Sequence, residues 1–239
     1  MNYLGCSGWS YDHWIKRFYP KDLPSNQWII YYAKTFNTVE INMSFYRFPF
    51  PNMIKAWYKK TPKDFKFTFK ANRLITHMKK LKNTKPIINR FYKLTDLMKE
   101  KLGCILFQLP PSIKYNKTLL NNFIKQLNKK YKNVIEFRHE SWFNKECYNI
   151  LKKNNIIYCI VSSPEMPEDY QKTSNIVYLR LHGKQGMYSD NYSKKELKEI
   201  ANKLKKLRYK HCYVYFNNDS NAYAVYNCIE LKKAMKRII

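Results

Sequence analysis

Eight short segments rich in β-branched and aromatic residues recur along the chain, and amphipathic segments fill most of the intervals between them. Strands that alternate with helices favour a parallel sheet, and nearly continuous apolar runs are typical of strands covered on both faces. Eight such units in 239 residues predict an α/β fold of the (β/α)8 TIM-like barrel type, which usually takes about 250 residues. The expected strands cover residues 2–9, 38–46, 66–71, 103–110, 133–139, 156–162, 176–183 and 212–219.

The intervals between these strands carry helix signals. Ser25 is expected to cap the helix after it, Pro86 to stand near a helix start, and Ser193 with Glu196 to form a capping box. The interval between the sixth and seventh strands has little helical periodicity, so its helix is expected to be degenerate or missing. A doubly wound open sheet is the alternative, but the GCSGW stretch lacks the Gly-x-Gly-x-x-Gly turn typical of that fold. Residues 1–239 contain no evident linker or repeat and are expected to form one domain.

Lysine dominates the charge of the chain, whose formal net charge is +28. Such a charge is typical of proteins that bind nucleic acid, but the codon bias of an AT-rich genome would produce the same excess of lysine. The six cysteines form no Cys-x-x-Cys pair and are expected to be small buried residues rather than a disulfide or zinc framework. No apolar stretch reaches the roughly 18 residues of a membrane span, so we expect a soluble, cytoplasmic protein with no membrane partner.

Polar or charged residues stand near the C-terminal ends of at least six expected strands. Residues two apart on a strand share a face, and inward side chains at these strand ends face the mouth of a barrel. So many polar groups in one place predict a functional site, although a purely structural layer of ion pairs is the alternative, because buried charges need partners in any case. The set comprises Glu40, Asn42, Lys70, Gln108, Glu136, Arg138, Arg180, His182 and Asn217.

The cations of this set favour an anionic ligand. Lys70, Arg138 and Arg180 outnumber the two carboxylates, and bidentate arginine suits phosphate and carboxylate groups. Gln108, Asn42 and Asn217 are then expected to orient the ligand. Lys70 would alternatively be a Schiff-base nucleophile if its pKa were depressed.

Proton transfer is assigned to the carboxylates and histidines of the same region. His182 beside Glu136 or Glu40 is the candidate general acid/base couple, and His77 is a second candidate. His139 has the opposite strand parity and is expected to be a loop or packing residue. Adjacent cations and the small number of histidine and acidic residues disfavour a metal site, and the residues indicate no cofactor.

Aromatic residues are expected at the rim of the same site. Trp9 and Tyr46 end two expected strands and Trp142 follows a third, so their rings could stack on a sugar or a nucleobase. The alternative is that these rings pack the loops over the barrel.

Seven blocks of the sequence resemble one known family. They read GCSGWSYDHWIKRFYP, TVEINMSFYRFP, FTFKANRLITH, ILFQLPPS, VIEFRHESW, VYLRLHG and VYFNND, and they cover essentially the whole chain in order. This pattern is similar to the YecE-like family, a domain of unknown function numbered 72. The resemblance implies a (β/α)8-like barrel but no settled activity. Fold analogy with xylose-isomerase-like barrels, which include an apurinic endonuclease, suggests nucleic-acid binding, yet the metal ligands of such nucleases are not evident here.

Three functional hypotheses follow. The leading hypothesis is a metal-independent hydrolase, isomerase or lyase that acts on a small anionic, sugar- or nucleotide-like ligand at the C-terminal face of the barrel. The first alternative is a protein that binds nucleic acid through its lysine-rich surface and its rim aromatics. The second alternative is a non-catalytic binding barrel.

Overall fold

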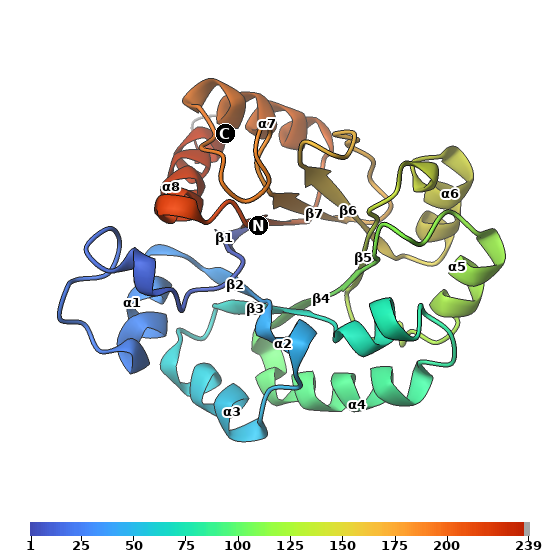
Figure 1. The fold of residues 1–239 in the computed structure, drawn as a ribbon, viewed down its shortest axis with the longest axis horizontal. Coiled ribbons are helices and arrows are strands. Elements are labelled where there is room, and N and C mark those ends of the chain that lie inside the picture. Colours follow the sequence, from blue (N-terminus) through green and yellow to red (C-terminus); the bar gives the residue numbers. More distant parts are fainter. Residues whose placement is uncertain (237–239) are drawn as a thin grey trace.

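A computed structural model of the chain describes residues 1–236, and its eight parallel strands form a nearly closed barrel surrounded by helices (Figure 1). The strands are hydrogen-bonded in the order β1-β8-β7-β6-β5-β4-β3-β2. From β2 to β8, each strand therefore pairs with the strand that follows it in the sequence, and β1 pairs with β8. This arrangement confirms the predicted (β/α)8 TIM-like barrel. The strands are β1 (Asn2–Cys6), β2 (Thr38–Ile41), β3 (Lys66–Lys70), β4 (Leu102–Gln108), β5 (Asn133–Glu136), β6 (Ile157–Ser162), β7 (Ile176–Leu181) and β8 (His211–Phe216).

Side chains join β1 to β2, the two strands at the ends of the hydrogen-bonded order. The Tyr32 hydroxyl accepts a hydrogen bond from a β1 amide at 2.7 Å and donates one to the Thr38 carbonyl at 3.0 Å. The Asn37 side chain bonds two further β1 backbone groups, at 2.9 and 3.1 Å. Gly5 permits this close approach, because a Cβ atom there would lie 2.0 Å from the Thr38 carbonyl oxygen. The barrel is therefore closed by hydrogen bonds of two side chains, Tyr32 and Asn37, and by the close approach at Gly5, rather than by a regular ladder.

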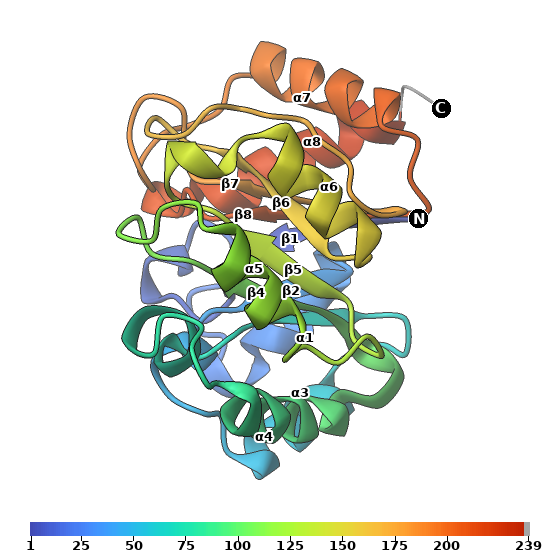
Figure 2. The same cartoon turned by 90° about the vertical axis from the view of Figure 1, so that its right-hand side faces the viewer.

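The helices lie outside the strands, with α7 and α8 on one side of the barrel and α3 and α4 on the opposite side (Figure 2). As predicted, the described chain has no helix between β6 and β7, and two helices, α2 and α3, separate β2 from β3. The helices are α1 (Trp28–Thr35), α2 (Met43–Tyr46), α3 (Pro51–Lys60), α4 (Lys85–Thr95), α5 (Lys117–Ile124), α6 (Lys145–Lys153), α7 (Lys194–Lys206) and α8 (Tyr223–Lys236).

Two of the three helix-start predictions are confirmed. Pro86 is in the first turn of α4, and Ser193 and Glu196 form the capping box of α7. The prediction for Ser25 is wrong, because a short 3-10 turn over Ser25–Gln27 precedes α1 and the Ser25 side chain caps neither element. The preceding Pro24, in an extended conformation, takes the cap position of that turn, so Ser25 lies inside it.

Two apolar layers hold the barrel together. The larger one packs the outward faces of the strands against the helices, as between Phe107 of β4 and Phe123 of α5. The smaller one fills the barrel interior and includes Tyr178, Tyr213 and Tyr215. Interior and polar strand-end residues share one parity along each strand, so the polar groups continue the inner layer towards the C-terminal strand ends. The six cysteines are free and buried in these layers, as expected.

Candidate functional site

Two buried carboxylates share one arginine at the centre of the barrel mouth. Arg180 of β7 donates from Nη2 and Nε to Glu40 Oε1 of β2, at 2.7 and 3.1 Å, and from Nη1 to Glu136 Oε2 of β5, at 2.8 Å. Both carboxylates are fully buried and Arg180 is 1% exposed. The three strands bring these residues together because all three side chains have inward parity at the same end of the barrel. The predicted cluster of Glu40, Glu136 and Arg180 is thus a connected network.

Arg138 and His182 extend the network from Glu136. The Arg138 Nε atom forms an ion pair with Glu136 Oε1, and its Nη2 atom lies 2.9 Å from His182 Nε2. Because a guanidinium can only donate, Nε2 accepts this hydrogen bond and the imidazole proton lies on Nδ1. The Asn217 amide nitrogen lies 3.0 Å from Nδ1, so the amide must be turned over for its oxygen to accept that proton. His182 is therefore a neutral imidazole that helps to hold Arg138.

The second carboxylate, Glu40, is bonded to neutral groups as well as to Arg180. Tyr178 donates its hydroxyl to Oε2, and Ser7 donates its own to Oε1 at 2.8 Å. Asn42 follows two residues later and donates from Nδ2 to the Ser7 carbonyl at 3.2 Å. The Asn42 Oδ1 atom is buried and has no hydrogen-bond partner within residues 1–236. One polar acceptor of the predicted site is therefore left unsatisfied.

The charges of the network set the protonation states of its members. Burial alone would raise the pKa of Glu136, but the Arg138 and Arg180 guanidiniums hold it well below its usual range. Burial and the neighbouring Arg180 lower the pKa of His182 to about 3. At neutral pH the Glu136 carboxylate is charged and His182 is not.

Lys70, at the C-terminal end of β3, differs from the two arginines because its ammonium has no carboxylate partner. Within the described residues no acidic side chain lies within ion-pairing distance of Nζ, which instead rests 4.2 Å from the centre of the Phe45 ring. Burial and the nearby Arg180 lower the pKa of this ammonium to about 8. Phe45 belongs to α2, and the backbone carbonyl of Lys70 accepts a hydrogen bond from Ser44 of the same helix. The lysine is thus a cation at the mouth that is free to meet a ligand.

Two of the remaining predicted residues, Gln108 and His77, lie near the ion-pair network. Gln108 stands opposite Glu136 in the β4–β5 register and donates to the Leu109 carbonyl at 3.3 Å. His77 lies on a π-helical turn, Leu74–Met78, and packs edge-on against Phe45 with ring centroids 4.8 Å apart. Gln108 therefore lies beside the network, and His77 lies beside the ring that covers Lys70.

Trp142 does not lie at the rim, which corrects the prediction for this residue. Its side chain is fully buried, stacks on Phe137 at 4.4 Å and donates its indole N–H to the Ile113 carbonyl. The short 3-10 turn Glu140–Trp142 directs the ring back into the layer between strands and helices, where it packs against the wall of the barrel. The His139 side chain caps this turn by accepting a hydrogen bond from the Ser141 amide, in line with the loop or packing role predicted for it.

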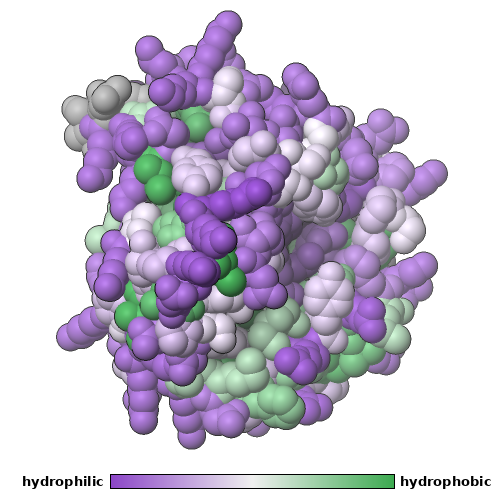
Figure 3. Space-filling model, turned by 60° about the vertical axis from the view of Figure 1, so that its left-hand side comes forward, coloured by the Kyte–Doolittle hydropathy of each residue, from purple (hydrophilic) through white to green (hydrophobic). Residues whose placement is uncertain are grey.

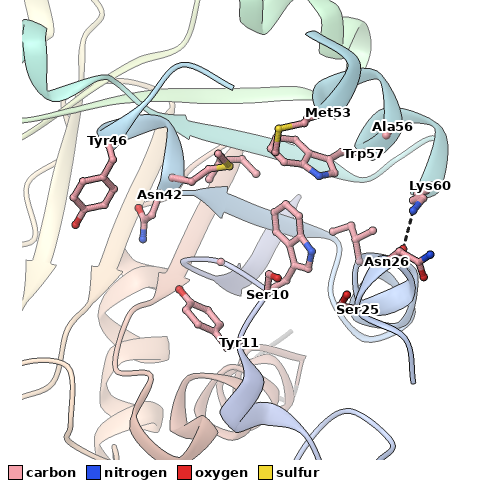
Figure 4. A pocket seen from close by; sticks show the side chains of 15 residues that line it. Ser10, Tyr11, Ser25, Asn26, Asn42, Tyr46, Met53, Ala56, Trp57 and Lys60 are labelled. Atoms are coloured by element: carbon pink, nitrogen blue, oxygen red, sulfur yellow. Dashed lines mark hydrogen bonds between the residues drawn. The ribbon is translucent and has the colours of Figure 1, made fainter. Parts of the chain in front are cut away.

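Trp9 and Tyr46 line a cavity of about 580 Å³ beside the mouth, which we call the aromatic cavity. One wall is the loop after β1, and the opposite wall is α3, from which Met53 and Trp57 project towards Ser10 and Tyr11 (Figure 4). The volume is in the range of small-molecule sites. The cavity is lined by Gly8, Trp9, Ser10, Tyr11, Ser25, Asn26, Ile29, Ile41, Asn42, Met43, Tyr46, Met53, Ala56, Trp57 and Lys60.

Several residues of this region were missed by sequence reasoning. Tyr178 lies two residues before Arg180 on the same strand, so strand parity alone could have identified it as an inward residue. Met53 and Trp57 lie four apart on α3, which places them on one helix face, but nothing local shows that this face looks onto the β1 loop. The face of the molecule drawn in Figure 3 is largely hydrophilic and has a hollow with hydrophobic side chains along part of its border.

The family model described as "Protein of unknown function DUF72" matches residues 3–238. The chain belongs to the DUF72 family. Among relatives, it is 28% identical to the UPF0759 protein YunF of Bacillus subtilis over 95% of this chain and 92% of that one. It is 27% identical to the UPF0759 protein YecE of Escherichia coli K12, over 61% of this chain and 51% of the relative.

Solved structures of DUF72 proteins share the fold of this chain. A crystal structure of a DUF72 family protein from Thermotoga maritima MSB8 superposes with a TM-score of 0.91 at 30% identity, over 99% of each chain. A DUF72 family protein from Enterococcus faecalis V583 gives a TM-score of 0.87 at 22% identity, over 99% of this chain and 96% of that one. The resemblance found in the sequence blocks is thereby confirmed.

Residues 1–236 of this DUF72 chain contain neither a membrane-spanning helix nor a cluster of metal ligands. No helix there is both long and apolar enough to cross a membrane. No group of three or more histidine, cysteine, aspartate or glutamate side chains in the same residues is arranged to hold a metal ion.

Proposed function

We propose that this DUF72 barrel is an enzyme that binds a small phosphate- or carboxylate-bearing ligand at its mouth and acts on it without a metal ion. The observation that carries the proposal is the unpaired ammonium of Lys70 beside a network whose other charges cancel. Glu40 and Glu136 balance Arg138 and Arg180, and His182 is neutral, so the mouth holds a surplus of one positive charge. A half-buried cation without a carboxylate partner is costly, and an anionic ligand would supply the missing negative charge.

The carboxylates themselves are poor candidates for binding a cation. Glu40 already accepts hydrogen bonds from Arg180, Ser7 and Tyr178, and Glu136 is paired with two guanidiniums. A metal ion at the mouth would have to displace these donors and approach fixed positive charges. This arrangement supports chemistry that uses the charges of the protein itself.

Lys70 is also the group whose acidity suits proton transfer near neutral pH. A general acid or base works best when its pKa lies near the working pH, and the pKa of Lys70 is lowered to about 8. His182 and Glu136, the catalytic candidates from the sequence, have pKa values held far below neutrality and would be weak bases. In the proposed reaction these two residues and Glu40 therefore orient Arg138 and Arg180, while Lys70 both binds the anion and exchanges a proton.

Binding of sulfate and inorganic phosphate, measured by isothermal titration calorimetry, tests the anion site. Lys70→Met should abolish binding, because it removes the unpaired cation. Lys66→Met is the matched control: Lys66 lies at the opposite end of the same strand, and its ammonium donates to the Glu100 carbonyl at 2.6 Å. Equal losses in the two variants, or anion binding that persists in Lys70→Met, would refute the proposal.

The net charge of +28 supports a second candidate function, the binding of nucleic acid. Contacts of surface lysines with phosphates weaken steeply with salt, whereas a ligand held at the mouth responds much less. Fluorescence anisotropy with a single-stranded oligonucleotide, at low and at about 200 mM salt, separates the two cases. Binding that survives the higher salt and is lost in Lys70→Met would favour nucleic acid as the substrate over a small anion.

A further inference from the structure

The aromatic cavity and the anion site share one short helix. Met43 and Tyr46 of α2 line the cavity, while Phe45 of the same helix covers the Lys70 ammonium. Asn42, directly before α2, also lines the cavity and is connected through Ser7 to the Glu40 carboxylate. A ligand whose anionic group meets Lys70 would therefore find the cavity beside it.

The lining of the cavity selects the kind of group that would enter. Trp9 and Trp57 meet edge to face at a centroid distance of 5.3 Å, and two methionines complete an apolar surface suited to an aromatic ring. Of the described residues that line it, Lys60 alone carries a charge, and its ammonium donates to the Asn26 carbonyl at 2.7 Å, as Figure 4 shows. The absence of an acidic side chain from this lining disfavours a cation, so the aromatic walls favour an uncharged ring.

The unpaired Asn42 acceptor adds a polar requirement. Its Nδ2 atom donates to the Ser7 carbonyl, and because a carbonyl can only accept, the amide cannot be turned over. Oδ1 is therefore fixed as a buried acceptor on a residue that lines the cavity. A buried acceptor without a partner is unfavourable, and a ligand N–H or O–H group would remove that cost.

We propose that the aromatic cavity is the subsite for an uncharged aromatic heterocycle that carries a hydrogen-bond donor, and that Asn42 Oδ1 accepts from this donor. The inference rests on the proposed function in one respect: the ring and the anionic group bound at Lys70 belong to one ligand. The cavity would then decide which of many anions the barrel takes.

Indole and benzofuran are matched probes for this subsite, because the two molecules have the same shape and only indole has an N–H donor. Isothermal titration calorimetry should show indole binding about tenfold more tightly, the gain expected when one buried acceptor is satisfied. Asn42→Leu should bring the two affinities together. If the wild type binds neither probe, or binds both equally, the proposal is overturned.

Two further variants test the location of the probe without disturbing the barrel. Ala56 lines the cavity from the half-buried face of α3, so Ala56→Phe should fill the cavity and abolish indole binding. Lys55→Phe adds the same ring at the adjacent exposed position and should bind indole normally. Indole binding that survives Ala56→Phe would show that the ring binds elsewhere.

The two proposals fail in different ways. Lys70→Met should keep indole binding, because the ring does not need the ammonium, and should lose sulfate binding. A wild type that binds indole but no sulfate refutes the anion site alone, whereas one that binds sulfate but no indole refutes the aromatic subsite alone.

Discussion

The neutral state of His182 predicts a specific loss of stability in acid. Its imidazole is fully buried between two arginines, and its pKa is lowered from the ordinary 6.5 to about 3. In the unfolded chain the same imidazole takes up a proton below about pH 6.5. The unfolded state then binds more protons than the folded state, so stability falls as the pH falls from 6.5 towards 3.

The size of the effect follows from the separation of the two pKa values. Each pH unit below 6.5 costs about 1.4 kcal/mol once the unfolded imidazole is protonated, so the contribution of His182 at pH 5 is a loss of about 2 kcal/mol relative to pH 7.5. His182→Gln keeps an acceptor for Arg138 and a donor for Asn217 but has no proton to gain. The variant should therefore lose about 2 kcal/mol less than the wild type over this range.

Urea-induced unfolding, followed by tryptophan fluorescence at pH 7.5 and at pH 5, measures this difference. Acidic groups contribute to acid destabilisation in both proteins, so only the difference between wild type and variant reports on His182. His139→Gln serves as the control, because His139 lies in an exposed hydrogen bond at the surface end of the same segment as Glu136. Equal losses in the wild type and in His182→Gln would show that the imidazole is charged in the folded protein and would refute the assignment of its proton.

Three other perturbations test the barrel and its mouth. Gly5→Ala should lower the free energy of unfolding by about 3 kcal/mol, because the new methyl group would meet the backbone of β2 at 2.0 Å. Gly103→Ala should cost only about 1 kcal/mol, because the nearest backbone atom to its methyl group lies at 3.1 Å. Urea-induced unfolding of the two variants measures the difference. Arg180→Met should cost about 3–5 kcal/mol at neutral pH, since two carboxylates lose their shared partner; a melting temperature close to that of the wild type would contradict the ion-pair network. Sulfate affinity should fall about tenfold for each pH unit above 8 as the Lys70 ammonium loses its proton, whereas in Lys70→Arg calorimetry should find no such fall.

Some expected strands end earlier than the sequence pattern suggests. The apolar pattern continues through residues 38–46, yet β2 ends at Ile41, and Met43–Tyr46 form the helix α2. Similarly, β5 ends at Glu136, so Arg138 reaches the network from just beyond the strand. Apolar composition alone does not separate a strand from a short buried helix, because both need a covered surface.

The sequence by itself determined the barrel and the inward direction of its polar side chains. Both follow from local periodicity: strands and helices alternate, and residues two apart on a strand share a face, which places Glu136 and Arg138 on the inside. No contact between distant residues is needed for these conclusions, so they can be read along the chain.

The tertiary structure decided which polar groups find partners and which do not. Glu40 and Glu136 share Arg180, His182 stays neutral, and Lys70 is left without a carboxylate, because these outcomes depend on distances across the barrel and on burial from all sides. The aromatic cavity arises in the same way, because the closed barrel brings the loop after β1 against residues of α1, α2 and α3. Which charged groups pair and which carry a proton depends on the assembled site, whereas strand parity shows only which side chains can reach the mouth.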